Sequence, residues 1–122
     1  MDTVIWIFQG LMSVLFIFHG IAMFNPPAAV QESVVKKMGY SLPFLKIIGT
    51  LEVLGGLGLI LPALTRVMPL LVPLAALGLV IIMIGAAVSH ARHGEDKQAV
   101  ATAVVTLLVA FVGIGRFWLS PI

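Results

Sequence analysis

The chain has 122 residues, of which 61% are hydrophobic and 10% are charged, and its formal net charge is +2. About 25% of the residues in a soluble domain are charged, so this composition excludes an ordinary soluble protein, and the length allows a single domain spanning residues 1–122. No basic patch with interleaved aromatic residues is present, which excludes a nucleic-acid partner. The absence of cysteine excludes disulfides, thiolate metal sites, iron–sulfur ligation and dithiol redox chemistry.

The first predicted element is an uninterrupted apolar run over residues 4–24, about the 20 residues that a helix needs to cross a hydrocarbon core. Its polar residues are Gln9, Ser13 and His19. No Lys or Arg precedes the run and no small-residue cleavage site follows it, which favours a retained transmembrane helix over a signal peptide. The helix is expected to end at Asn25-Pro26-Pro27.

A short segment between the first and second spans combines apolar and polar residues at helical spacing. The pattern predicts a short amphipathic helix over residues 28–38 at the membrane surface, ended by Gly39. A solvated loop is the alternative that the sequence leaves open. The apolar members of the segment are Val30, Val34, Val35 and Met38, and the polar members are Gln31, Glu32, Lys36 and Lys37.

The second predicted span, residues 44–61, carries Glu52 near its middle. Its Leu, Ile and Val residues each favour insertion by about 0.3 to 0.6 kcal/mol, whereas a mid-helix charge opposes it by about 2.5 to 3.5 kcal/mol. These contributions nearly cancel, so we expect this helix to insert together with a neighbour. Gly49, Gly55 and Gly56 lie on the face of Glu52, where small residues let a neighbouring helix approach closely.

A third span is predicted over residues 67–90, after the short connection 62–66. Pro69 suits the first turn of this helix, whereas Pro73 removes a backbone hydrogen bond and is expected to kink it. The small residues within 85–89 form a patch suited to helix packing.

The fourth span is predicted over residues 99–119, after the charged loop 91–98. Arg116 and Trp118 at its far end are expected to act as anchors at the membrane interface. The sequence thus predicts an all-α fold, an integral membrane antiparallel four-helix bundle with a short interfacial helix between spans 1 and 2. Most Lys and Arg residues lie in the first and third loops, so the positive-inside rule predicts a multi-pass protein of the cell (inner) membrane with both termini outside the cytoplasm.

The polar residues within the spans define a candidate site. At 1.5 Å per residue, His19 lies about 7 Å from the membrane midplane and Glu52 lies near it, so the two can pair across antiparallel helices. An ionisable residue in the hydrocarbon core is a candidate functional site, and Glu52 could be a proton relay, a general acid/base or the polar anchor of a lipophilic ligand pocket. The alternative is a carboxyl group that only helps the helices to pack.

Metal and haem sites are not expected. No two candidate ligands within the spans have the i, i+3 or i, i+4 spacing of a helical metal site. His19 and His90 differ in depth by about 11 Å, which argues against haem ligation by both imidazoles. His90 and His93 are expected to be interfacial and solvated, and Lys46 is expected to extend toward the lipid headgroups.

Several motifs distributed along the chain carry a resemblance to a known family. They are Phe18-His19-Gly20, Gly49-Thr50-Leu51-Glu52-Val53-Leu54-Gly55-Gly56, Leu61-Pro62, Pro73-Leu74-Ala75-Ala76-Leu77-Gly78-Leu79, Met83-Ile84-Gly85-Ala86-Ala87-Val88-Ser89-His90-Ala91-Arg92-His93-Gly94-Glu95 and Gly115-Arg116-Phe117. With them the chain resembles the DoxX-like family of small four-helix membrane proteins, although Met23 departs from the basic residue often found there. The family includes a subunit linked to thiosulfate:quinone oxidoreduction and membrane partners of redox-stress enzymes. The resemblance implies that Glu52, His19, His90 and Arg116 match polar sites of the family.

The resemblance and the polar residues together predict a component of a redox-related membrane process that binds a lipophile or a quinone, with Glu52 as its buried polar centre. Because the chain has no cysteine, a quinone or a partner enzyme would carry the electrons, and no other cofactor is evident. The expected partners are the lipid bilayer, a lipophilic small molecule, and a redox enzyme or a second copy of the chain (a homo-oligomer). The catalytic candidates are Glu52 and His19, and the ligand-binding candidates are Gln9, Thr50, His90 and Arg116.

Three other functions stay open. A cofactor-independent enzyme, such as an isomerase, epoxide hydrolase or cyclase, would use Glu52 as its general acid/base and His19 to orient it. A proton-coupled small-molecule exporter would use the same carboxylate, although small multidrug transporters carry their glutamate on the first span. A structural assembly partner would need only the glycine face of the second span.

Overall fold

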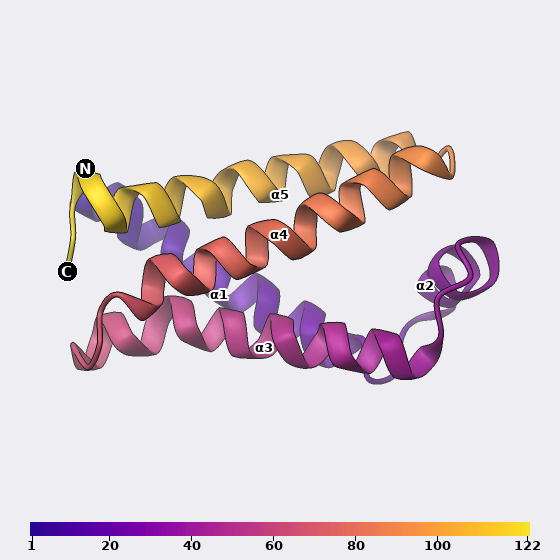
Figure 1. The fold of residues 1–122 in the computed structure, drawn as a ribbon, viewed down its shortest axis with the longest axis horizontal. Helices are drawn as coiled ribbons and strands as arrows, with labels where there is room; N and C mark the ends of the chain where they lie inside the picture. Colours follow the sequence, from indigo (N-terminus) through magenta and orange to yellow (C-terminus); the bar gives the residue numbers. More distant parts are fainter.

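The structure, a computed structural model that describes residues 1–122, consists of four long helices and short helical segments (Figure 1). Each long helix, with α5 counted together with its extension η2, is long and apolar enough to cross a membrane. The predicted all-α, four-span architecture is therefore confirmed. The helices are α1 (Asp2–Ala22), α2 (Ala28–Val30) with its π-helical continuation η1 (Gln31–Lys37), α3 (Leu42–Thr65), α4 (Leu71–Arg92), and α5 (Asp96–Ile114) with its π-helical continuation η2 (Gly115–Leu119).

The long helices pack as two pairs, α1 with α3 and α4 with α5, and further contacts between α3 and α4 join the pairs. Figure 1 shows the pairs close together at the end that carries both termini and spread apart toward α2. We call these the closed end and the open end of the bundle. The hydrophobic core lies toward the closed end and comprises Met12, Phe16, Leu59, Ala76, Leu79, Met83, Val109 and Val112.

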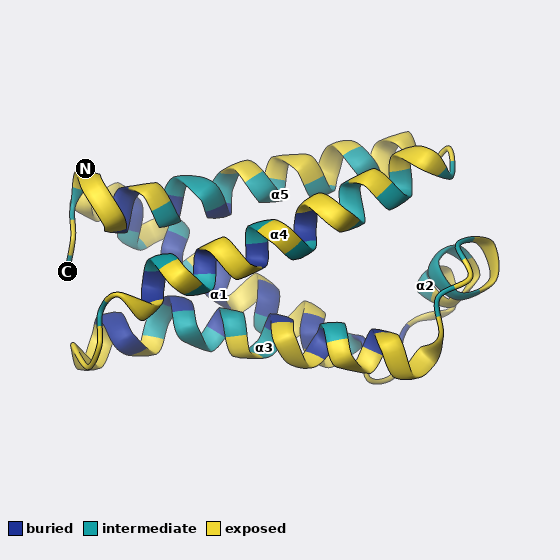
Figure 2. Ribbon diagram, viewed as in Figure 1, coloured by how far each residue is buried: buried dark blue, intermediate teal, exposed yellow.

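Large apolar side chains cover the outside of the bundle, and Figure 2 shows exposed residues along the outer faces of all the long helices. Phe18, Leu64 and Leu107 are among them, with 69%, 64% and 70% of their surface exposed. Water would not tolerate so much apolar surface on a monomer, whereas lipid tails solvate it. Every backbone hydrogen bond in such helices is made within the helix, as a bilayer requires.

The positions of Pro62 and Pro73 within their helices differ from those that the sequence predicted. α3 runs on to Thr65 and contains Pro62, whereas the predicted span ended one residue before this proline. Pro62 is buried, and packing in the bundle holds the last turn although the ring removes a hydrogen bond. Pro73 lies in the first turn of α4, where a backbone N–H has no partner within the helix. The predicted kink at Pro73 is therefore wrong.

Residues 28–38 are helical and amphipathic, so the helix predicted here is confirmed and the solvated loop is not formed. All four apolar residues of the segment are half-buried, and the four polar residues among them are exposed. Pro26-Pro27 precedes the segment, and Gly39 ends it with a φ of +83°, a left-handed conformation that glycine adopts without a steric penalty.

Candidate functional site

Glycines bring α1 and α3 into backbone contact. A Cβ atom placed on Gly49 would lie 2.5 Å from the carbonyl oxygen of Gly20, and one on Gly56 would lie 2.9 Å from the carbonyl oxygen of Ser13. No side chain fits at either glycine without a shift of the neighbouring backbone. Of the face predicted from the spacing of Gly49, Gly55 and Gly56, Gly49 and Gly56 form the surface on which α1 packs, whereas Gly55 packs against Leu79 of α4.

The close approach lets polar side chains of α1 reach α3. The hydroxyl of Ser13 donates a hydrogen bond of 2.7 Å to the carbonyl oxygen of Gly56. Six residues further along α1, Nδ1 of His19 lies 2.8 Å from Oε2 of Glu52. The sequence predicted that these two residues could pair across antiparallel helices, and the structure brings them together.

The two partners of this pair differ in exposure. Glu52 is buried, with 1% of its side chain exposed, whereas 53% of the His19 side chain is exposed. Nδ1 of His19 is engaged with Glu52, which leaves Nε2 as the ring nitrogen available to another molecule. When the pair is neutral overall, the shared proton lies between Nδ1 and Oε2 and Nε2 carries a hydrogen. When the pair loses one proton, Nε2 becomes an acceptor.

A cavity of about 590 Å³ opens beside this pair at the open end of the bundle. Side chains from α1, α3, α4 and α5 line it, and the short segment α2–η1 covers one side. Most of the lining is apolar, and Met23, Ile48, Ile82 and Ala86 are representative. Its polar groups come from His19, Glu52, Ser33, Tyr40, Ser89 and His90, with Gln98 and Thr102 on α5.

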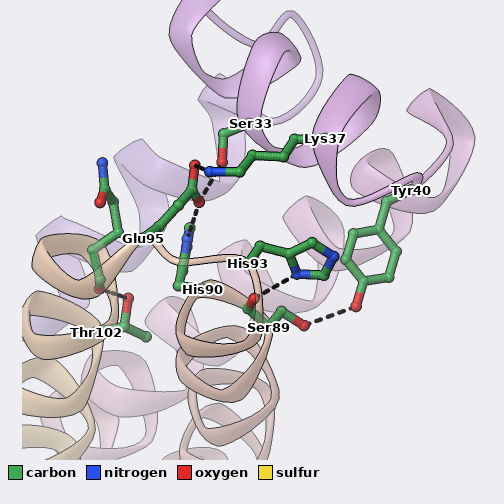
Figure 3. Close-up of polar contacts among 9 residues, drawn as sticks. Ser33, Lys37, Tyr40, Ser89, His90, His93, Glu95 and Thr102 are labelled. Atoms are coloured by element: carbon green, nitrogen blue, oxygen red, sulfur yellow. Dashed lines mark hydrogen bonds and ion pairs between the residues drawn. The ribbon is translucent and has the colours of Figure 1, made fainter.

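A second imidazole–carboxylate pair lies at the loop end of the cavity (Figure 3). Nδ1 of His90 lies 2.7 Å from Oε1 of Glu95, and the hydroxyl of Ser33 donates a hydrogen bond of 2.6 Å to the same oxygen. Nζ of Lys37 lies 3.6 Å from the other carboxylate oxygen. The Ser33 hydroxyl, followed by His90, holds the pKa of Glu95 below its ordinary value, because both stabilise the carboxylate form.

The packing of α3 on α4 fixes the distance between the two pairs along the bundle. A Cβ on Gly55 would meet the side chain of Leu79, and one on Gly58 would meet Ala75. In this antiparallel arrangement Glu52 is level with residue 82. His90 is therefore about 12 Å further along the helix axis, at 1.5 Å per residue. The cavity extends from a deep polar pair to a polar mouth.

Gln9 and Arg116 lie at the closed end, away from the cavity. Arg116 is buried, and its Nε donates a hydrogen bond of 2.8 Å to Gln9, whose amide also donates to the carbonyl oxygen of Leu59. Nη1 of Arg116 lies 2.6 Å from Oδ1 of Asp2, and the guanidinium stacks 4.8 Å from the centre of the Trp6 ring. The prediction that Arg116 is an interface anchor is wrong, because this residue ties the two ends of the chain together.

Thr50 and the histidines complete the predicted set. The Thr50 side chain is exposed and donates a hydrogen bond of 2.8 Å to the carbonyl oxygen of Lys46 on its own helix, so the structure does not bring it to the cavity. His90 was expected to be solvated, but only 19% of its side chain is exposed. His93 is half-buried, and its Nδ1 lies 2.8 Å from the carbonyl oxygen of Ser89.

Comparison with known families gives one match, to the DoxX-like family over residues 7–113. This chain belongs to the DoxX-like family. The match covers most of the chain, including both helix pairs and the cavity. Comparison with curated proteins and with solved structures finds no match.

Sequence reasoning missed several residues at the cavity mouth of this DoxX-like protein, namely Glu95, Ser33, Tyr40 and Ser89. The hydroxyl groups of Tyr40 and Ser89 lie 2.8 Å apart (Figure 3). Glu95 lies in the charged loop that the sequence predicts over residues 91–98. The one sequence signal for its role was its position five residues after His90, across the end of the helix. Its partners on η1 are distant in sequence, so no local pattern indicated those contacts.

Proposed function

We propose that this DoxX-like protein binds a lipophilic small molecule of the quinone class in the cavity, as a component of a redox-related membrane process. The His19–Glu52 pair holds the polar group of the ligand. The observation that carries the proposal is a buried carboxylate paired with a half-exposed imidazole at the wall of an apolar cavity of about 590 Å³.

The dimensions and the lining of the cavity support a small-molecule ligand. Cavities that bind such ligands measure about 300–1,000 Å³ and combine apolar walls with a few convergent polar groups. This cavity falls in that range. Its walls suit a hydrophobic ring or isoprenoid chain, and burial of such a group removes apolar surface from contact with water at the mouth.

The chemistry of His19 fits a quinone in particular. A quinone oxygen accepts a hydrogen bond, whereas the hydroxyl of its reduced form donates one. Nε2 of His19 is a donor when the His19–Glu52 pair is neutral and an acceptor when the pair has lost a proton, so one group can bind both forms. A bound quinone would supply two-electron redox chemistry that a cysteine-free chain lacks in its own side chains.

Glu52→Gln tests the role of the His19–Glu52 pair. Glutamine keeps the volume and an oxygen that accepts from Nδ1 of His19, but it cannot exchange a proton. We expect the wild-type protein, purified in mild detergent, to retain a lipophilic species detectable by native mass spectrometry. The variant should bind a short-chain ubiquinone analogue at least about tenfold more weakly, because a hydrogen bond involving a charged group contributes roughly 1.5–3 kcal/mol.

Thr50→Val is the matched control, because residue 50 lies two positions away on the same helix and does not contact the cavity. It should bind the analogue as the wild type does. Equal affinity in all three proteins, with no species retained by any of them, would refute the proposal.

A cofactor-independent enzyme acting on a lipophilic substrate is the second candidate. The specific observation in its favour is the orientation of a nearly inaccessible carboxylate by an imidazole, which is a common arrangement in general acid/base catalysis. Turnover of an added epoxide or isomerisable lipophile that Glu52→Gln abolishes would favour this candidate over simple binding.

In this proposal the protein lies in the cell inner membrane, with the cavity mouth on the cytoplasmic side and both termini on the other side. The positive-inside rule supports this orientation, since Arg116 at the closed end is buried in internal contacts and Arg66 is the remaining cation there. A redox enzyme or a second copy of the chain would then dock from the same membrane. The cations at the open end are Lys36, Lys37, Lys46, Arg92 and Lys97.

A further inference from the structure

The segment 28–38, which we call the cover, lies over the mouth of the cavity without packing closely on any long helix. Close contacts of α2 and η1 are almost all with each other. The inward residues Val30, Val34 and Met38 line the cavity. In an ordinary interfacial helix the apolar face lies in lipid, whereas here it faces the cavity and so forms part of its wall.

One carboxylate holds the cover to the rest of the bundle. Glu95, at the turn between α4 and α5, accepts a hydrogen bond from Ser33 and forms an ion pair with Lys37, both on η1. His90 orients Glu95 from α4, and a hydrogen bond between Tyr40 and Ser89 adds a contact where the cover joins α3. We call the contacts of Glu95 with Ser33 and Lys37 the latch (Figure 3).

The chain at both ends of the cover would allow the cover to rotate as a rigid unit. Pro26-Pro27 precedes it, and no hydrogen bond continues the α1 helix across these residues because proline has no backbone N–H. Gly39 ends it at a φ of +83°, with nothing within 4 Å of a Cβ placed there. Small changes of backbone angle at these two points would move the cover with little disturbance of α1 or α3.

We propose that the cover is a gate, and that the latch at Glu95 holds it closed over the cavity mouth. Ligands then enter from the loop end of the bundle, past the short helix, and reach the His19–Glu52 pair about 12 Å deeper. The gate regulates the site described under the proposed function, but its motion does not depend on which ligand binds there.

The absence of cysteine makes a reporter cysteine straightforward. Ala86→Cys places a thiol in the cavity wall, in a position that is half-buried. The protein is placed in lipid nanodiscs, so that lipid covers the sides of the bundle, and a bulky water-soluble maleimide is added. When Glu95→Gln is combined with Ala86→Cys, the labelling rate should rise about tenfold. The reason is that loss of contacts to a charged group shifts the equilibrium between the closed and open gate by about one power of ten.

Two further reporters separate gating from loss of structure. Thr65→Cys is exposed at the closed end and should react at the same rate with and without Glu95→Gln. Ala63→Cys lies in the core with 3% of its surface exposed and should stay unreactive in both backgrounds. The gate would be overturned if Glu95→Gln raised the labelling rate at position 63 together with that at position 86. It would also be overturned if the labelling rate at position 86 did not rise. Because no quinone is added, this result is independent of whether the proposed ligand binds.

Discussion

Replacement of Gly49 by alanine tests the reasoning that glycine contacts set the geometry of the His19–Glu52 pair. The new Cβ would lie 2.5 Å from the carbonyl oxygen of Gly20 and 2.7 Å from Cβ of Met23. Neither neighbour is the end of a flexible side chain, so α1 must move away. An ordinary contact of 3.4 Å requires about 0.9 Å of additional separation, and overpacking of this kind costs about 1–3 kcal/mol.

The same movement affects the His19–Glu52 pair, one turn of α3 away from Gly49. Its hydrogen bond of 2.8 Å would lengthen beyond the range in which hydrogen bonds are effective. We therefore expect Gly49→Ala to lower the midpoint of thermal unfolding in detergent, by about 4 °C for each kcal/mol in a chain of this size. It should also weaken quinone binding as Glu52→Gln does.

Gly78→Ala is the matched control, since nothing lies within 4 Å of a Cβ placed at Gly78 on α4. There the same chemical change only reduces the backbone freedom of the unfolded chain, which stabilises the helix by about 0.5–1 kcal/mol. The two variants should shift the unfolding midpoint in opposite directions. Equal shifts in Gly49→Ala and Gly78→Ala would refute the backbone-contact argument.

Two further predictions concern the ends of the bundle. The pKa of Glu95 is lowered from 4.5 in the folded protein, so its stabilisation is complete above that pH and is lost as the pH falls through the lowered pKa. The difference in unfolding midpoint between wild type and Glu95→Gln should therefore be largest near neutral pH and shrink in acid; a constant difference would contradict this. Arg116→Lys loses the bond to buried Gln9 and should destabilise the protein by about 1–3 kcal/mol, whereas Arg92→Lys at an exposed position should leave the midpoint unchanged.

From the amino-acid sequence alone we predicted the four spans, a short amphipathic helix over residues 28–38 with a solvated loop as its alternative, and that His19 could pair with Glu52. Span length and the 3.6-residue period act locally, so they fix both the depth of a residue in the membrane and the face of the helix on which it lies. Gly49 and Gly56 follow the same period and therefore marked the contact surface with α1 in advance.

The sequence-based predictions for Arg116 and Glu95 differed from the structure for one physical reason. Each depends on how helices that are distant in sequence are aligned and tilted, which side-chain packing across the interface decides. Arg116 was placed at a membrane interface by its position in a span, but the proximity of the chain ends buries it against Gln9. Thr50 is a different case: two residues correspond to about 200° around a helix, so the period itself already placed Thr50 opposite Glu52, and its side chain bonds its own helix.

The local pattern of the chain determined which segments enter the bilayer and which residues share a depth, because those properties depend on only a few consecutive turns. Tertiary structure decided that the two helix pairs spread apart at one end, that a cavity forms between them, and that Glu95 contacts Ser33 beside the cavity mouth. The angle between the pairs follows from close packing of Gly55 on Leu79 and of the core at the closed end, and such contacts exist only once the helices have assembled.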